Sequence, residues 1–124
     1  MLERVKAAGH VEVTEAMIAL FRFAGVDQRR PSQIARNARL SKQATNDMLR
    51  ELERLGYLAR HPDPDDGRAR IIRLTERGRA LDSAVWEAGR AVEQSWRRRL
   101  PAEEWATFND VLAGVIGAHG QPPE

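Results

Sequence analysis

The fold is decided by one stretch of the chain, residues 41–78, which has the sequence SKQATNDMLRELERLGYLARHPDPDDGRARIIRLTERG. In its first part, apolar residues recur at the three- and four-residue spacing of an amphipathic helix. Its second part holds two short segments rich in Ile, Leu and Tyr, YLARH and RIIRL, which predict strands. Two prolines, three aspartates and a glycine lie between these segments and predict a hairpin loop.

The predicted helix has an apolar side and a polar side. Ser41 is its expected N-cap, and Gly56 is expected to end it. At about 100° per residue, the apolar side carries Ala44, Thr45, Met48, Leu49, Leu52 and Leu55. The polar side carries Lys42, Gln43, Asn46, Asp47, Arg50 and Arg54.

Two helices are expected before this stretch. Thr14 is a candidate cap, and Gly25 is expected to end the first of them. Its apolar stripe consists of Met17, Leu20, Phe21 and Ala24. Pro31 suits the first position of a second, short helix whose buried face is Ile34, Ala35 and Ala38.

Two more helices are expected after it. Thr75 is the expected cap of a long helix over roughly residues 76–100, and Pro101 can begin another. The stripe of this last helix is Trp105, Phe108, Leu112 and Val115 or Ile116. The segment 119–124 is expected to be a flexible tail.

The order of helix, short helix, turn, polar-faced helix and hairpin predicts a winged helix-turn-helix. The fold class is therefore mainly α with a small β-hairpin wing, and residues 14–75 form the predicted DNA-binding lobe. In this fold the second helix of the pair lays its polar face in the major groove of DNA, and the hairpin is the wing.

The charge distribution agrees with a polyanionic partner. The net charge of the 124 residues is +2, but residues 29–79 contain 13 Lys and Arg against 7 Asp and Glu. The flanking segments contain 7 against 11. A basic middle between acidic flanks favours binding to nucleic acid, although a solvated surface would also carry such charges.

Several other functions find no support in the sequence. The chain contains no cysteine, which excludes disulfides and thiol chemistry and is compatible with the cytoplasm. His10, His61 and His119 are scattered without metal-ligand spacing, so neither a metal nor another cofactor is expected. No catalytic motif is present, and no apolar run is long enough to cross a membrane. An enzyme is not expected.

Two segments resemble the MarR family of bacterial transcription regulators: SQIARNARLSKQATNDMLRELERLGYLAR (32–60) and DPDDGRARIIRLTERGR (63–79). The more specific is the second, with an Asp-x-Arg wing at Asp66 and Arg68, a short strand, and Leu-Thr-x-x-Gly before a long helix. Two features depart from the family. Only about ten residues precede Val11, where the family usually has a longer first helix, which leaves open a truncated start. In addition, Arg39 stands at a turn position where glycine is common.

The resemblance implies a dimeric, cytoplasmic repressor that binds a palindromic operator in double-stranded DNA and responds to a small-molecule effector. Segments 1–13 and 76–118 would then contain the dimerisation helices, and Trp105, Phe108 and Leu112 would be buried between two copies. A ligand pocket between the DNA-binding lobe and the dimer helices is implied too, with His10, Phe21 and Trp86 as its candidate lining.

Individual roles on the DNA surface follow from side-chain chemistry. Gln43 and Asn46 can make paired hydrogen bonds to adenine, and Lys42 and Arg50 can reach guanine or phosphate. In the wing, the resemblance implies that Asp66 orients Arg68 and that Arg68 enters the minor groove. Asp63 and Asp65 are expected to shape the turn. The complete predicted DNA-binding set is Ser41, Lys42, Gln43, Thr45, Asn46, Arg50, Asp66, Arg68 and Arg70.

Two alternatives to a ligand-responsive repressor stay open at this stage. One is a winged-helix module that binds proteins and not DNA, and the other is a constitutive DNA-binding protein without an effector. The basic residues Lys42, Arg50, Arg68 and Arg70 favour DNA, because an interaction module has little need of them.

Overall fold

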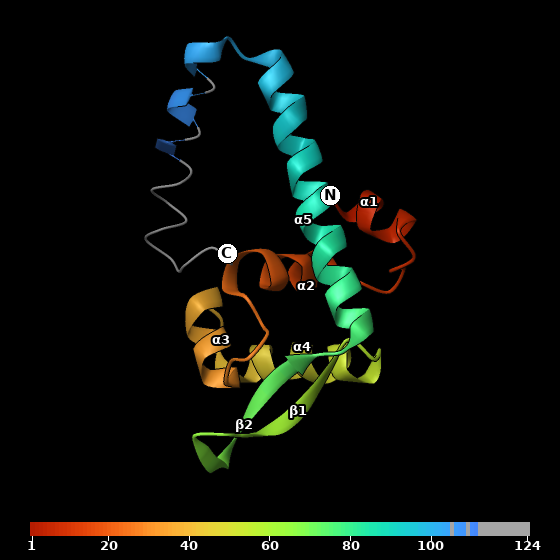
Figure 1. The fold of residues 1–124 in the computed structure, drawn as a ribbon, viewed down its shortest axis with the longest axis vertical. Helices are drawn as coiled ribbons and strands as arrows, with labels where there is room; N and C mark the ends of the chain where they lie inside the picture. Colours follow the sequence, from red (N-terminus) through yellow and green to blue (C-terminus); the bar gives the residue numbers. More distant parts are fainter. Residues whose placement is uncertain (105, 109, 112–124) are drawn as a thin grey trace.

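The computed structural model describes residues 1–104, 106–108 and 110–111. It is a mainly helical chain with one antiparallel hairpin (Figure 1). The elements are α1 (Leu2–Ala7), α2 (Glu15–Ala19), η1 (Leu20–Ala24), α3 (Pro31–Ala38), α4 (Lys42–Arg54), β1 (Leu58–Asp63), β2 (Asp66–Leu74) and α5 (Glu76–Arg99). The predicted fold class is confirmed. Predictions that fall on Trp105, Leu112, Val115 or Ile116, and the tail 119–124, lie outside the described residues.

The first predicted helix is present but changes its winding. The Thr14 hydroxyl accepts a hydrogen bond from the Met17 backbone N–H at 3.2 Å, which caps α2. The second half of this helix, η1, has the wider winding of a π-helix and ends at Gly25, whose φ is 74°. Its expected stripe is buried throughout: Met17, Leu20, Phe21 and Ala24.

The turn between α3 and α4 accommodates Arg39 where glycine is common. Arg39 has φ 56° and ψ 39°, the left-handed conformation that glycine adopts more easily than an L side chain. Ser41 then caps α4 by accepting the Ala44 backbone N–H at 3.0 Å, as predicted. The helix-turn-helix is therefore formed with the expected boundaries.

The hairpin is tighter than the sequence suggested. Strands β1 and β2 pair from Leu58 opposite Leu74 to Pro62 opposite Arg70, after which the register shifts and Asp63 pairs with Asp66. Residues 64–65 alone form the turn, because the extra residues of β2 are taken up by the register shift. A single bridge between Arg29 and Ile72 adds the chain before α3 to this sheet.

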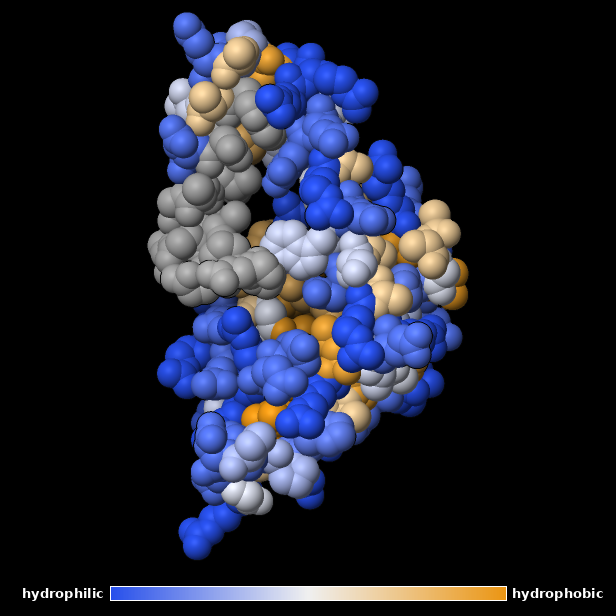
Figure 2. Space-filling model, viewed as in Figure 1, coloured by the Kyte–Doolittle hydropathy of each residue, from blue (hydrophilic) through white to orange (hydrophobic). Residues whose placement is uncertain are grey.

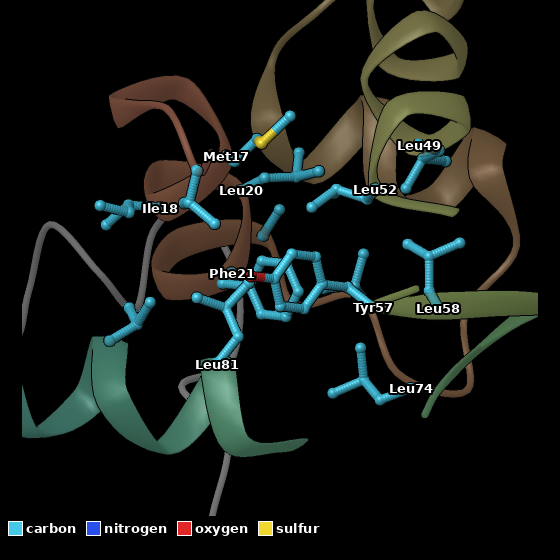
Figure 3. Packing of buried hydrophobic residues seen from close by; sticks show 14 of the residues in the cluster. Met17, Ile18, Leu20, Phe21, Leu49, Leu52, Tyr57, Leu58, Leu74 and Leu81 are labelled. Atoms are coloured by element: carbon cyan, nitrogen blue, oxygen red, sulfur yellow. The ribbon is translucent and has the colours of Figure 1, made fainter. Parts of the chain in front are cut away.

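One hydrophobic core joins the helices to the base of the hairpin. Figure 3 shows Leu20, Phe21, Leu52, Tyr57 and Leu81 converging from segments that are far apart in the sequence. Tyr57 is completely buried between α4 and β1. The wing and α4 are thus positioned by the same core, with the hairpin at one end of the molecule and α5 leading away from it (Figure 1).

The first half of α5 belongs to this core. Leu81 and Val85 of α5 are completely buried within the chain, and Ala88 is 2% exposed, so these residues of the predicted dimerisation segment 76–118 pack against their own chain. They pack in the same cluster as η1, because α5 crosses it. Further along, the Phe108 ring packs edge-on against Trp96, with 5.3 Å between ring centroids. No helix among the described residues is long and apolar enough to cross a membrane.

Substitution of Gly78 tests whether α5 must approach the base of the hairpin as closely as it does in the structure. A Cβ atom at this position would lie 1.9 Å from the Tyr57 carbonyl oxygen. We expect Gly78→Ala to lower the free energy of unfolding by about 1–3 kcal/mol through overpacking, although alanine favours a helix more than glycine does. Equilibrium urea unfolding measures this change.

Gly67→Ala is the matched control, because a Cβ atom at Gly67 meets nothing within 4 Å. Its effect should stay within about 0.5 kcal/mol. Equal stability of the Gly78→Ala variant and the unmodified protein would show that the close approach is not required.

Candidate nucleic-acid interface

The polar side of α4 carries four of the predicted DNA-binding residues, and Ser41 caps the start of the helix. Ser41, Lys42, Gln43 and Arg50 are exposed, and Asn46 is half-buried. Leu49 and Leu52 on the opposite side are completely buried, which fixes the direction in which the polar side points. The structure therefore brings Lys42, Gln43, Asn46 and Arg50 together on one helix face, with Ser41 at the start of the helix.

Asp47 organises two of these side chains. Its Oδ1 atom accepts hydrogen bonds from the Gln43 side-chain amide and from the Arg50 guanidinium, both at 3.0 Å. The contact with Arg50 is an ion pair, which reduces the repulsion expected between an unpaired aspartate and DNA. Because all three side chains are exposed, these contacts are weak and can be exchanged for contacts with a ligand.

Thr45 does not belong to this surface, which corrects the sequence prediction. Its side chain is 1% exposed, and its hydroxyl has no hydrogen-bond partner among the described residues. Thr45 precedes Leu49 by four residues, so it lies on the buried side of the helix. Conversely, Ala44 was expected to be buried on the apolar side but is exposed.

In the wing, Asp66 contacts Arg68 in a different way from the one predicted. The Asp66 Oδ1 atom accepts the backbone N–H of Arg68 at 3.1 Å, so it fixes the backbone of Arg68 and not its guanidinium. Both side chains are exposed. Asp63 shapes the turn as expected, because its Oδ1 atom accepts the Asp65 backbone N–H at 2.9 Å.

A hollow of about 420 Å³ lies between α3, α4 and β2. It joins the polar side of α4 to the wing, and it is lined by Arg30, Pro31, Ser32, Lys42, Asn46, Ala69 and Arg70. Three of these residues are basic, and Ser32 and Asn46 add hydrogen-bonding groups. Figure 2 shows that the surface around the hairpin is mainly hydrophilic, whereas apolar atoms reach the surface nearer the middle of the molecule.

Arg30 and Ser32 are site residues that the sequence analysis missed. They stand just before and inside the start of α3, and they meet Arg70 only because the hairpin folds back beside α3. The cluster Arg29-Arg30 directly before Pro31 was the one available sequence signal, since it adds two cations to a helix start.

None of the hollows formed by the described residues alone is lined by more than one of the three candidate ligand residues. The buried His10 ring nitrogen Nδ1 lies 2.8 Å from the Tyr57 hydroxyl. Burial, and then the positive charge of Arg77, lower the pKa of His10. Phe21 lines a hollow of about 90 Å³ that includes Asp82 but neither His10 nor Trp86. This hollow is smaller than ligand pockets usually are, since those begin at roughly 300 Å³.

Trp86 is connected to that hollow indirectly. Burial raises the pKa of Asp82; a side-chain hydrogen bond from Trp86 opposes this rise, and the negative charge of Asp27 adds to it. The effector site thus stays a prediction, and in this conformation the hollow would have to widen. No group of three or more His, Asp or Glu residues suited to a metal ion occurs in the described part of the chain.

With this geometry established, comparison with known proteins identifies the family. A family model described as MarR family matches residues 13–69. The structure of the MarR family protein Rv2887 of Mycobacterium tuberculosis, in complex with salicylic acid, is 30% identical in sequence. The similarity covers 91% of this chain and 85% of that chain, with a TM-score of 0.62. The chain belongs to the MarR family.

Other relatives agree with this assignment. The same M. tuberculosis protein, named as a transcriptional repressor, is 36% identical over 81 residues, which are 65% of this chain and 58% of that protein. This MarR-family chain thus matches less than two thirds of the length of that relative. The structure of Streptococcus pneumoniae FabT in complex with DNA is 21% identical, with a TM-score of 0.74 over 93% of this chain and 82% of that chain, and shows the same fold.

The Asp66 contact gives a direct test of how the wing is held. If the acceptor oxygen matters, Asp66→Asn keeps the bond to the Arg68 N–H and Asp66→Ala loses it. We expect amide hydrogen exchange at Arg68, corrected for intrinsic rates, to be about fivefold faster in Asp66→Ala, the effect of roughly 1 kcal/mol. In Asp66→Asn it should stay near the unmodified rate. Equal acceleration in both variants would instead assign the effect to the carboxylate charge.

Proposed function

We propose that this chain is a sequence-specific DNA-binding transcriptional regulator, acting as a repressor in the cytoplasm, and that it catalyses no reaction. The observation that carries the proposal is the continuous polar surface formed by α4, the hollow and the wing. Lys42 on α4, Arg30 before α3 and Arg70 on β2 line the same hollow, so cations from three segments face one site. Such convergence suits a phosphate backbone, while Gln43 and Asn46 beside it suit base edges.

The relatives support the repressor assignment. Rv2887 is named as a repressor, and FabT was captured with DNA on a fold that this chain shares. A protein-binding module without DNA contact would not require the three converging cations. This alternative is therefore disfavoured by the same hollow that supports DNA binding.

We extend the proposal to a homodimer on a palindromic operator. Phe23 and Val111, which are 56% and 61% exposed in the single chain, are apolar side chains that a second copy would cover. Two copies would place two α4 helices in successive major grooves. The salicylic acid complex of Rv2887 supports a small-molecule effector for this chain, in preference to constitutive binding.

Selection of bound sequences from random DNA duplexes tests the proposal. We expect enrichment of an inverted repeat whose half-site centres lie about one helical turn, roughly 10 base pairs, apart. In the Asn46→Ala variant, preference should relax at one or two positions of each half-site, at a cost of about 1–3 kcal/mol per lost base contact.

Thr45→Val is the matched control on the neighbouring residue. It removes a buried hydroxyl without touching the exposed surface, so it should select the same sequences as the unmodified protein. Absence of any enriched sequence would contradict the proposed function and favour the protein-binding alternative. A single, unrepeated half-site would contradict the dimer.

A further inference from the structure

Arg30 stands where the helix-turn-helix meets the wing, 33 residues before its partner Asp63 in the sequence. Its Nε–H donates to the Asp63 Oδ2 atom at 2.7 Å, and its backbone N–H donates to the Gln33 side chain at 2.9 Å. The guanidinium is thus held from the wing while the backbone is held by α3. This ion pair is the direct side-chain link between the first helix of the pair and the tip of the hairpin.

Asp63 is fully engaged in this arrangement. One carboxylate oxygen binds Arg30, and the other accepts the Asp65 backbone N–H. Its side chain is 10% exposed, whereas that of Arg30 is 39% exposed, so the cation and not the anion faces solvent. The Asp65 N–H bond and then Arg30 lower the pKa of Asp63, and the hydrogen bond with Asp63 raises the pKa of Arg30. Both groups are therefore charged at neutral pH.

The two Nη groups of Arg30 remain available. Among the described residues neither has a hydrogen-bond partner, and Arg30 lines the hollow together with Ser32, Lys42 and Arg70. A guanidinium presents five N–H donors in a planar fork that matches phosphate oxygens. With the Nε edge fixed by Asp63, the opposite side of the fork is the part that can bind a ligand in the hollow.

We propose that Arg30 binds one backbone phosphate of DNA in this hollow, and that Asp63 is the positioning residue that holds Arg30 for it. This inference rests on the proposed function and adds a contact that neither the sequence pattern nor the predicted binding set contained. Asp63 removes rotamer freedom that a free arginine would lose on binding. It also ties the wing to α3, so that α4 and the wing meet DNA as one unit.

A simpler account makes the opposite prediction. If Asp63 were merely a negative charge near phosphates, its neutralisation would strengthen DNA binding. If Asp63 positions Arg30, the same change weakens binding although it removes a repulsive charge. The sign of the effect distinguishes the two accounts.

Asp63→Asn and Asp65→Asn are the matched pair for this test. Both remove one negative charge from the same turn, but only Asp63 contacts Arg30. Asn at position 63 retains an oxygen for the Asp65 N–H, which preserves the turn. On the operator selected by the unmodified protein, we expect Asp63→Asn to weaken binding about tenfold, the order of one charge-assisted hydrogen bond. Asp65→Asn should bind equally well or more tightly.

Arg30→Gln completes a double-mutant cycle. It should weaken binding at least as much as Asp63→Asn, and it should lower the slope of log affinity against log salt by about one unit. The combined variant should bind no more weakly than Arg30→Gln alone, because both changes act through one contact.

A scan with single methylphosphonate linkages, which are uncharged, identifies the phosphate. One linkage should weaken binding of the unmodified protein and leave Arg30→Gln unaffected. The methylphosphonate scan tests the Arg30–phosphate contact even if Asp63→Asn proves unstable in a thermal unfolding control, because the scan does not use that variant. Equal binding by the two Asn variants, or no linkage specific to Arg30, would overturn the inference while leaving the proposed function intact. Failure of the unmodified protein to bind any DNA would overturn the proposed function itself.

Discussion

The burial of Leu49 and Leu52 on one side of α4 is the constraint on which the rest of the structure depends. Leu49 and Leu52 are inaccessible to solvent, and each contributes roughly 2 kcal/mol by leaving water. Because a helix cannot rotate without exposing these leucines, the opposite side must face outward. The direction of Lys42, Gln43 and Asn46 is therefore a consequence of core packing and not of any contact they make themselves.

The wing depends on the same core for its position. Tyr57 is buried at the base of the hairpin, its hydroxyl lies near His10 Nδ1, and its carbonyl oxygen lies against Gly78 at the start of α5. Near the base of the hairpin, the Arg29–Ile72 bridge fastens β2 to the segment before α3, and at the tip the Arg30–Asp63 ion pair fastens β1 to the same segment. A hairpin fixed at both ends keeps a constant distance from α4, which a surface that reads two grooves of DNA requires.

Local signals in the sequence were sufficient to predict the helices, the hairpin and the residues that cap or end the helices, but not the short turn of the hairpin. The caps Thr14, Ser41 and Thr75 act within three residues of themselves, and Gly25 and Gly56 end helices with φ of 74° and 84°. For this reason the winged helix-turn-helix could be predicted. Helical periodicity placed both Ala44 and Thr45 on the apolar side; Thr45 is buried there, whereas Ala44, at the edge of that side, is exposed.

Contacts between distant segments could not be predicted in this way. Arg30 and Asp63, and His10 and Tyr57, are 33 and 47 residues apart, and no periodicity links them. The charge of the Asp-rich turn was visible in the sequence, but its partner was not. The family resemblance implied an orienting role for Asp66, which in the structure binds the Arg68 backbone, whereas Asp63 holds an arginine side chain.

The central claim is that α4, the start of α3 and the wing bind DNA together as one surface. Mapping of backbone amide chemical shifts by NMR, with and without the selected operator, tests it most directly. The account predicts that the largest chemical-shift changes fall in residues 30–32, 41–50 and 63–70, and that all three segments reach saturation at the same molar ratio of operator to protein. Changes confined to α4 with an unaffected hairpin, or changes centred on α1 and α5, would contradict it.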